Sequence, residues 1–103
     1  MSLRIQEEFN ETNNCWDIVL EGEVDIATSQ SLRDRLKEKY DERKASFCMD
    51  LAGLNYIDST GLGVIIGAFG RMQEEGNKIC ISNPKENVAK LLRITNLDKI
   101  LCV

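Results

Sequence analysis

The stretch Asp58-Ser-Thr-Gly-Leu-Gly-Val-Ile-Ile-Gly-Ala-Phe-Gly70 decides how this chain folds. Its polar start and the apolar period that follows predict a helix from about Ser59 to Glu75, which Gly76 and Asn77 end. At about 100° per residue, the large apolar side chains of this helix gather on one side. These side chains are Leu62, Ile65, Phe69 and Met72. We expect that side to face the hydrophobic core.

Three glycines, Gly63, Gly67 and Gly70, lie on nearly the opposite side of the predicted helix. An interior glycine costs about 1 kcal/mol relative to alanine, so the three together cost roughly 3 kcal/mol. No packing gain inside the domain offsets this cost, which favours close approach of another molecule to the helix backbone. Ile66, at the edge of the glycines, would give that partner an apolar contact. The alternative is that a neighbouring loop of the same chain covers the glycines.

Ser59 and Thr60 begin the predicted helix, and Ser59 falls beside the glycines. Free backbone N–H groups and the positive end of the helix dipole meet at a helix start. A phosphate group attached there is electrostatically favoured. Two interpretations therefore stay open: Ser59 is a phosphate acceptor, or Asp58 or Ser59 merely caps the helix.

Short apolar segments on either side of this helix predict a sheet. The expected strands are 3–9, 15–22, 46–51, 78–82 and 100–103, the last of them at an edge. The polar turn 11–14 makes the first two strands an antiparallel hairpin. Residues 53–58 are predicted to form a loop.

Two further helices are expected, one after Thr28 as its N-cap and one after Asn83 as its N-cap, with Pro84 in its first position. Strands that alternate with helices imply parallel pairing and right-handed crossovers. The fold class is therefore α/β, with a mixed, mostly parallel sheet of four to five strands and three helices. Residues 1–103 form a single domain, with no linker or repeat.

Composition excludes several classes of function. The chain has 103 residues, a net charge of −4 and a pI near 4.8, with its basic residues scattered. Nucleic-acid binding depends on clustered Lys and Arg, so neither nucleic acid nor an anionic membrane is an expected partner. The sequence has no apolar run of membrane-spanning length and no signal region, and we expect a cytoplasmic protein.

Cysteine and histidine usage argues against cofactor and metal chemistry. The four cysteines contain no Cys-x-x-Cys pair, and the chain has no histidine. We expect no cofactor, and four buried thiols in a reducing compartment: Cys15, Cys48, Cys80 and Cys102. Without histidine, the commonest general base and the usual partner of a nucleophilic serine are missing.

Enzyme motifs are absent from the central stretch. Asp58-Ser59 is not a Gly-x-Ser-x-Gly elbow, and Gly61-Leu-Gly63 lacks the lysine and spacing of a phosphate-binding loop. We therefore do not expect an enzyme. A weak magnesium site at one sheet edge is the remaining alternative, because three carboxylates fall near predicted strand ends: Asp25, Asp50 and Asp58.

The chain resembles the bacterial anti-sigma factor antagonists, which have the STAS fold. The matching stretches run in the family's order across nearly the whole chain: Gly22-Glu-Val-Asp25, Met49-Asp-Leu51, Ile57-Asp-Ser-Thr-Gly-Leu-Gly63, Asn83-Pro84 and Thr95-Asn-Leu-Asp-Lys-Ile100. The family usually continues into a further C-terminal helix, which is missing here because the chain stops at Val103. The resemblance thus implies a truncated chain or a short member, as a monomer or weak dimer.

The resemblance implies a switch in partner binding. In that family the matching serine, Ser59 here, is phosphorylated by a partner that is both anti-sigma factor and serine kinase. The unphosphorylated form binds this partner and frees the sigma factor; phosphorylation releases the partner, and a separate serine phosphatase resets the switch. Asp25 matches an acidic residue close to the phosphorylated serine. The expected partner-binding residues are Asp25, Asp58, Ser59, Thr60, Gly61, Gly63, Ile66, Gly67 and Gly70.

Two other functions are compatible with the same sequence. One is a STAS module in a stress-signalling scaffold or a transport complex, because fold and motif would serve there equally. The other is a small nucleotide-binding enzyme, in which the carboxylates would hold a metal ion.

Overall fold

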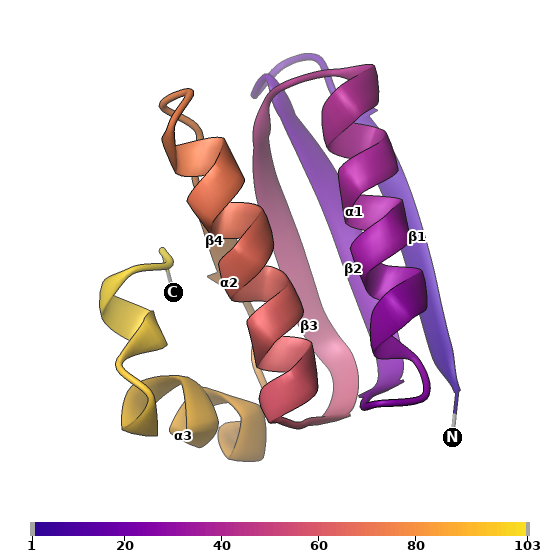
Figure 1. Cartoon of the computed structure of the whole chain (residues 1–103), viewed down its shortest axis with the longest axis vertical. Helices are drawn as coiled ribbons and strands as arrows, with labels where there is room; N and C mark the ends of the chain where they lie inside the picture. Colours follow the sequence, from indigo (N-terminus) through magenta and orange to yellow (C-terminus); the bar gives the residue numbers. More distant parts are fainter. Residues whose placement is uncertain (1, 103) are drawn as a thin grey trace.

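Four strands form one mixed sheet in the order β1-β2-β3-β4 (Figure 1). The computed structural model describes residues 2–102. The strands are β1 (Leu3–Asn10), β2 (Cys15–Val24), β3 (Ser46–Ile57) and β4 (Ile79–Ser82). β1 and β2 form the expected antiparallel hairpin, and β2, β3 and β4 pair in parallel. The predicted α/β class with a mixed, mostly parallel sheet is confirmed.

Three helices and a short 3₁₀ turn complete the fold. They are α1 (Ser29–Glu42), α2 (Ser59–Gln73), α3 (Glu86–Ile94) and η1 (Leu97–Lys99). α1 and α2 lie side by side over one face of the sheet, and α3 lies near the end of the sheet where α2 begins (Figure 1). Within residues 2–102, no helix combines the length and the apolar character that a membrane crossing requires.

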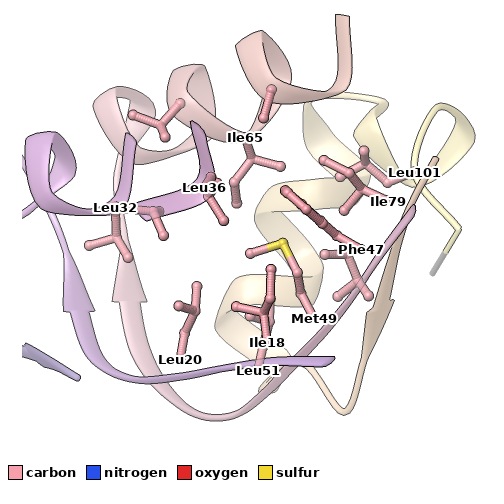
Figure 2. Close-up of a cluster of buried hydrophobic side chains, with 14 of the residues drawn as sticks. Ile18, Leu20, Leu32, Leu36, Phe47, Met49, Leu51, Ile65, Ile79 and Leu101 are labelled. Carbon is pink, nitrogen blue, oxygen red and sulfur yellow. The ribbon is translucent and has the colours of Figure 1, made fainter. Parts of the chain in front are cut away.

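The hydrophobic core lies between the sheet and the two helices that cover it, α1 and α2 (Figure 2). Alternate residues of the central strands point into it, which the period of a strand dictates. β2 and β3 supply Ile18, Leu20, Phe47, Met49 and Leu51, and the helices supply Leu32, Leu36 and Ile65. Each of these is at most 1% exposed, so each stabilises the fold by about 1.5–3 kcal/mol.

The prediction of a loop at residues 53–58 is wrong, because β3 continues through this segment to Ile57. Leu54 and Ile57 are buried in the core, and β2 extends alongside as far as Val24. The register between the strands shifts twice, between Val19 and Glu21 and again between Gly22 and Glu23. Such irregularities kink the strands without ending the pairing.

The predicted start of α3 is also wrong. Asn83 has a left-handed backbone (φ 54°), and the helix begins two residues after Pro84, with Lys85 in the N-cap position. The last expected strand, 100–103, is reduced in the described residues to a single parallel bridge between Cys80 and Cys102. Val103 lies outside the described residues.

The expectation of four buried thiols holds for one cysteine only. Cys15 is buried, Cys48 and Cys80 are half-buried, and Cys102 is exposed. Burial, reinforced by the neighbouring Cys48 thiol, raises the pKa of Cys15 to about 12, so this thiol is protonated at neutral pH. Along their strands Cys15, Cys48 and Cys80 alternate with buried core residues, so they point to the face of the sheet that α1 and α2 leave free.

A salt bridge ties α1 to the edge strand β1. The Glu7 side chain is 4% exposed and points to the helix side of the sheet, level with Ile18. The Arg35 guanidinium donates hydrogen bonds to both Glu7 carboxylate oxygens and a further one to the Ile5 carbonyl oxygen (3.3 Å). A bidentate guanidinium satisfies the buried carboxylate and fixes α1 across the hairpin.

We expect Arg35→Met to lower the free energy of unfolding by about 2 kcal/mol, because Glu7 then stays buried without a counter-charge. Arg33→Met is the matched control, since Arg33 lies on the exposed face of the same helix. Urea unfolding followed by circular dichroism measures both. Equal destabilisation by the two variants would contradict this role of Glu7 and Arg35.

Candidate functional site

The start of α2 is capped by Asp58. The Asp58 backbone is extended, and its carboxylate accepts a hydrogen bond from the Gly61 N–H at 3.0 Å. Its carbonyl oxygen accepts the first helical bond, from Leu62 N–H, also at 3.0 Å. Ser59 is therefore the first helical residue and is exposed, while Thr60 is half-buried. Of the two open interpretations, the cap belongs to Asp58, and the Ser59 hydroxyl is accessible to another molecule.

The end of β2 lies directly beside the start of α2. Val24 pairs with Ile57, and the Val24 carbonyl oxygen accepts a hydrogen bond from Asp58 N–H at 3.1 Å. Asp25 and Asp58 thus follow two neighbouring strands at the same edge of the sheet. The sequence predicted that Asp25 and Asp58 would lie at one edge of the sheet. The structure brings their backbones side by side there.

The Asp25 side chain organises its own loop. Asp25 is 8% exposed, and its carboxylate accepts hydrogen bonds from the N–H groups of Ala27 (2.9 Å) and Thr28 (3.1 Å). Thr28 occupies the predicted N-cap position of α1 but makes no side-chain cap bond; its hydroxyl donates to the Glu23 carbonyl oxygen instead. Asp25 therefore shapes the loop that lies next to Ser59.

Gly61 departs from the expected binding surface. It is buried, and a Cβ atom at this position would lie 2.5 Å from Val24 Cγ1 and 2.8 Å from Ile57 Cγ1. Gly61 lacks a side chain because the first turn of α2 packs against the strand ends. Its role lies inside the domain, so Gly61 is not part of the surface that a partner would touch.

The other three glycines of α2 face solvent. A Cβ atom added at Gly63 or Gly70 would have no neighbour within 4 Å among the described residues, and one added at Gly67 would meet only Arg71 Nη1, at 3.8 Å. No loop in the described part of the chain covers them, so the intramolecular alternative fails. We call this exposed side of α2 the glycine face: Ser59, Gly63, Ile66, Gly67 and Gly70.

Apolar side chains border the glycine face. Ile66 is 45% exposed, as the sequence suggested. A shallow groove beside it, between α2 and η1, is lined by Ile66, Phe69, Gly70, Gln73, Leu97, Ile100 and Leu101. Exposed apolar surface rimmed by polar residues is typical of an interaction site. The glycine face and this groove together form a continuous candidate docking surface.

Ile26 is a surface residue that the sequence interpretation missed. It is 81% exposed, at the tip of the Asp25 loop, beside the edge where α2 begins. The available signal was a single large apolar residue that directly follows Asp25 in the loop before α1. From the sequence alone, Ile26 could equally have been a buried residue at the end of the preceding strand.

The magnesium alternative has no support in the described residues. β3 continues for seven residues beyond Asp50, so Asp50 lies within the strand rather than at the edge with Asp25 and Asp58. Its carboxylate accepts the Ala52 N–H at 3.0 Å. These three aspartates do not converge on one point in residues 2–102.

Known proteins resemble this chain over nearly its whole length. The family model of the STAS domain matches residues 7–103. An anti-sigma-B factor antagonist of Bacillus subtilis (strain 168) is 29% identical over 99 residues, which cover 96% of this chain and 90% of the relative. An anti-sigma F factor antagonist of Paenibacillus polymyxa is 28% identical over 100 residues, which cover 96% and 86%.

Solved structures share the fold. A candidate anti-sigma factor antagonist from Thermotoga maritima superposes with a TM-score of 0.82 at 21% identity, over 94% of this chain and 82% of that chain. The Bacillus cell fate determinant SpoIIAA in its phosphorylated form superposes with a TM-score of 0.70 at 19% identity, over 95% and 88%.

The two classes of glycine in α2 predict opposite effects of one added methyl group. Gly61→Ala is expected to lower the free energy of unfolding by about 1–3 kcal/mol, because the new Cβ collides with Val24 and Ile57. Gly70→Ala is expected to raise it by about 0.5–1 kcal/mol, because alanine favours the helix and the site is open. Thermal and urea unfolding measure both; stabilisation by Gly61→Ala would refute the proposed packing.

Proposed function

Because the chain belongs to the STAS domain family, we propose that it is an anti-sigma factor antagonist whose partner binding is controlled at Ser59. The unphosphorylated protein binds an anti-sigma factor that is also a serine kinase, and so frees a sigma factor for transcription. Phosphorylation of Ser59 releases the anti-sigma factor. A serine phosphatase returns the protein to its binding form.

The observation that carries this proposal is the exposed serine at the start of an exposed glycine face. Gly63, Gly67 and Gly70 weaken α2 by roughly 3 kcal/mol in total, with no packing return inside the described domain. A partner that lies directly on the helix backbone explains why these positions lack side chains. Small residues allow such close approach, and Ile66 and the adjoining groove add apolar contact.

Phosphorylation changes this surface without changing the fold. A phosphate adds about −1.5 to −2 charge and three acceptor oxygens. At Ser59 it meets the positive end of the α2 dipole and the first-turn N–H groups that Asp58 does not cap, so the domain itself tolerates it. A partner packed closely on Gly63 and Gly67 meets both the charge and the bulk. Release therefore requires no refolding.

The names of the relatives are consistent with this role. The Bacillus subtilis and Paenibacillus polymyxa relatives are anti-sigma factor antagonists for two different sigma factors, B and F. SpoIIAA, which shares the fold, has been described in a phosphorylated form. The similar identities to the B and F antagonists favour neither sigma factor as the target of this chain.

The proposal predicts that a charge at position 59 disrupts partner binding. Pull-downs from the native host with wild-type and Ser59→Ala baits are expected to recover an anti-sigma factor, whereas Ser59→Asp is expected to bind it at least roughly tenfold more weakly. Incubation of wild-type protein with the recovered partner and ATP should place one phosphate on Ser59, mapped by mass spectrometry. Equal recovery by Ser59→Asp, or phosphate at another residue, would contradict the proposal.

A bulky side chain on the glycine face is expected to block the partner while leaving the domain folded. Gly67→Gln places a long side chain where the described structure has open space, so unfolding stability should hold or rise while affinity falls at least roughly tenfold. Ser31→Gln, on the exposed face of α1, is the matched control and should bind normally. Isothermal titration with the recovered partner distinguishes the two, and unchanged binding by Gly67→Gln would exclude this face.

A further inference from the structure

The free face of the sheet carries a row of sulfur and carboxylate side chains. α1 and α2 cover the opposite face (Figure 1). Trp16, Phe47 and Met49 are buried in the core on that covered face. The residues that alternate with them therefore point the other way. In the strand register, Asp17 of β2 is level with Cys48 of β3, and Cys48 is level with Cys80 of β4.

Three of these side chains converge at one point. Cys48 Sγ lies 3.2 Å from Cys15 Sγ, and Cys15 Sγ lies 3.8 Å from Asp17 Oδ1. One ligand atom from each of the three residues lies within 4.8 Å of the other two. In a tetrahedral zinc site with Zn–S bonds of about 2.3 Å, neighbouring ligand atoms are about 3.5–4 Å apart. The Cys15–Asp17 spacing lies within that range, and the Cys15–Cys48 sulfur spacing is a few tenths of an ångström shorter, so the two thiols would have to move slightly apart to hold the ion.

The surroundings hold these ligands in place. Cys15 and Asp17 are fixed two residues apart on β2, which pairs on one side with β1 and on the other with β3. Asn10 Nδ2 donates to Asp17 Oδ2 at 3.1 Å, which directs the other carboxylate oxygen towards Cys15. A hydrogen bond that orients a carboxylate ligand in this way is a common feature of metal sites in proteins.

We propose that Cys15, Asp17 and Cys48 form a binding site for a thiophilic divalent cation, with zinc as the expected ion. Two thiolates and one carboxylate supply three negative charges to an ion of charge +2. Sulfur ligands select zinc over magnesium or calcium, which prefer oxygen. The open side of the sheet leaves the fourth position to water or to the Cys80 thiol next in the row. This site is independent of the proposed role of Ser59.

Metal binding at this site is coupled to folding. The three ligands come together only when β2 and β3 pair, so the ion favours the folded chain over the unfolded one. It links the beginnings of the two central strands, which lie far apart in sequence. Binding also displaces the thiol protons, so titration of the metal should acidify a weakly buffered solution.

The test uses the full chain, kept reduced and stripped of metal, with Co²⁺ as the spectroscopic probe and Zn²⁺ as the competitor. We expect one equivalent of Co²⁺ to give near-ultraviolet thiolate charge-transfer absorption, which Zn²⁺ then removes. Zn²⁺ should also raise the midpoint of thermal unfolding. A reduced chain that gives no charge-transfer band and no shift with Zn²⁺ would overturn the proposal.

Variants locate the ligands. Cys48→Ser and Asp17→Asn should each weaken Co²⁺ binding by roughly a hundredfold, and Asn10→Ala by about tenfold through the lost carboxylate contact. Cys102→Ser is the matched control, because it removes a thiol on the far side of Cys80 from Cys48; it should bind as the wild type does. Because Cys48 is half-buried, Cys48→Ser should fold, and circular dichroism verifies that. Loss of the cobalt band in Cys102→Ser, or a Co²⁺ affinity in Cys48→Ser equal to that of the wild type, would refute this ligand set.

Discussion

The close packing of Gly61 against Val24 and Ile57 is the constraint on which the rest of the site depends. At this point the first turn of α2 lies directly on the ends of β2 and β3, with no room for a Cβ atom. The contact brings the Asp58 cap and the Asp25 loop to one edge of the sheet, because these residues follow the paired Val24 and Ile57. Ser59 is exposed there because Asp58 takes the capping role that a serine often fills. The absence of a side chain at Gly61 thus determines the position of Ser59, the candidate phosphate acceptor.

The glycines of α2 illustrate two opposite reasons for the same residue type. Gly61 serves stability, since a larger residue would separate helix and sheet. Gly63, Gly67 and Gly70 oppose stability, since alanine would strengthen the helix at each of these open positions. Residues that weaken a fold without an internal gain mark surfaces shaped for another molecule, and this contrast, within one helix, supports a docking surface better than the glycine count does.

The sequence predicted the parts of the fold that follow a simple period. The core side of α2 was recognisable because Leu62, Ile65, Phe69 and Met72 recur at helical spacing. Three of them are buried, and Phe69 is partly buried against the core, where it also lines the groove. The end of β3 was not recognisable, because its buried residues pass from a spacing of two to a spacing of three after Leu51, with Leu54 and Ile57 next. The two register shifts against β2 cause that change, and Gly53 and Asn55 make the segment look like a turn. Burial of Gly61 could have been predicted, since the projection that turns Gly63 outward places Gly61 on the core side, one turn before Ile65.

The thiol cluster shows most clearly what spacing along the chain cannot reveal. Cys15 and Cys48 are 33 residues apart and belong to no short motif, so a search for metal spacings excludes them. They meet because parallel pairing sets Asp17 level with Cys48, a consequence of register alone. The same two strands carry both candidate sites at opposite ends, since β2 runs for ten residues from Cys15 to Val24, or roughly 30 Å. An ion at the beginning of the strands touches nothing at the docking surface. Its effect there would have to pass through the register of β2 and β3, the one feature that positions both the ligands and the start of α2.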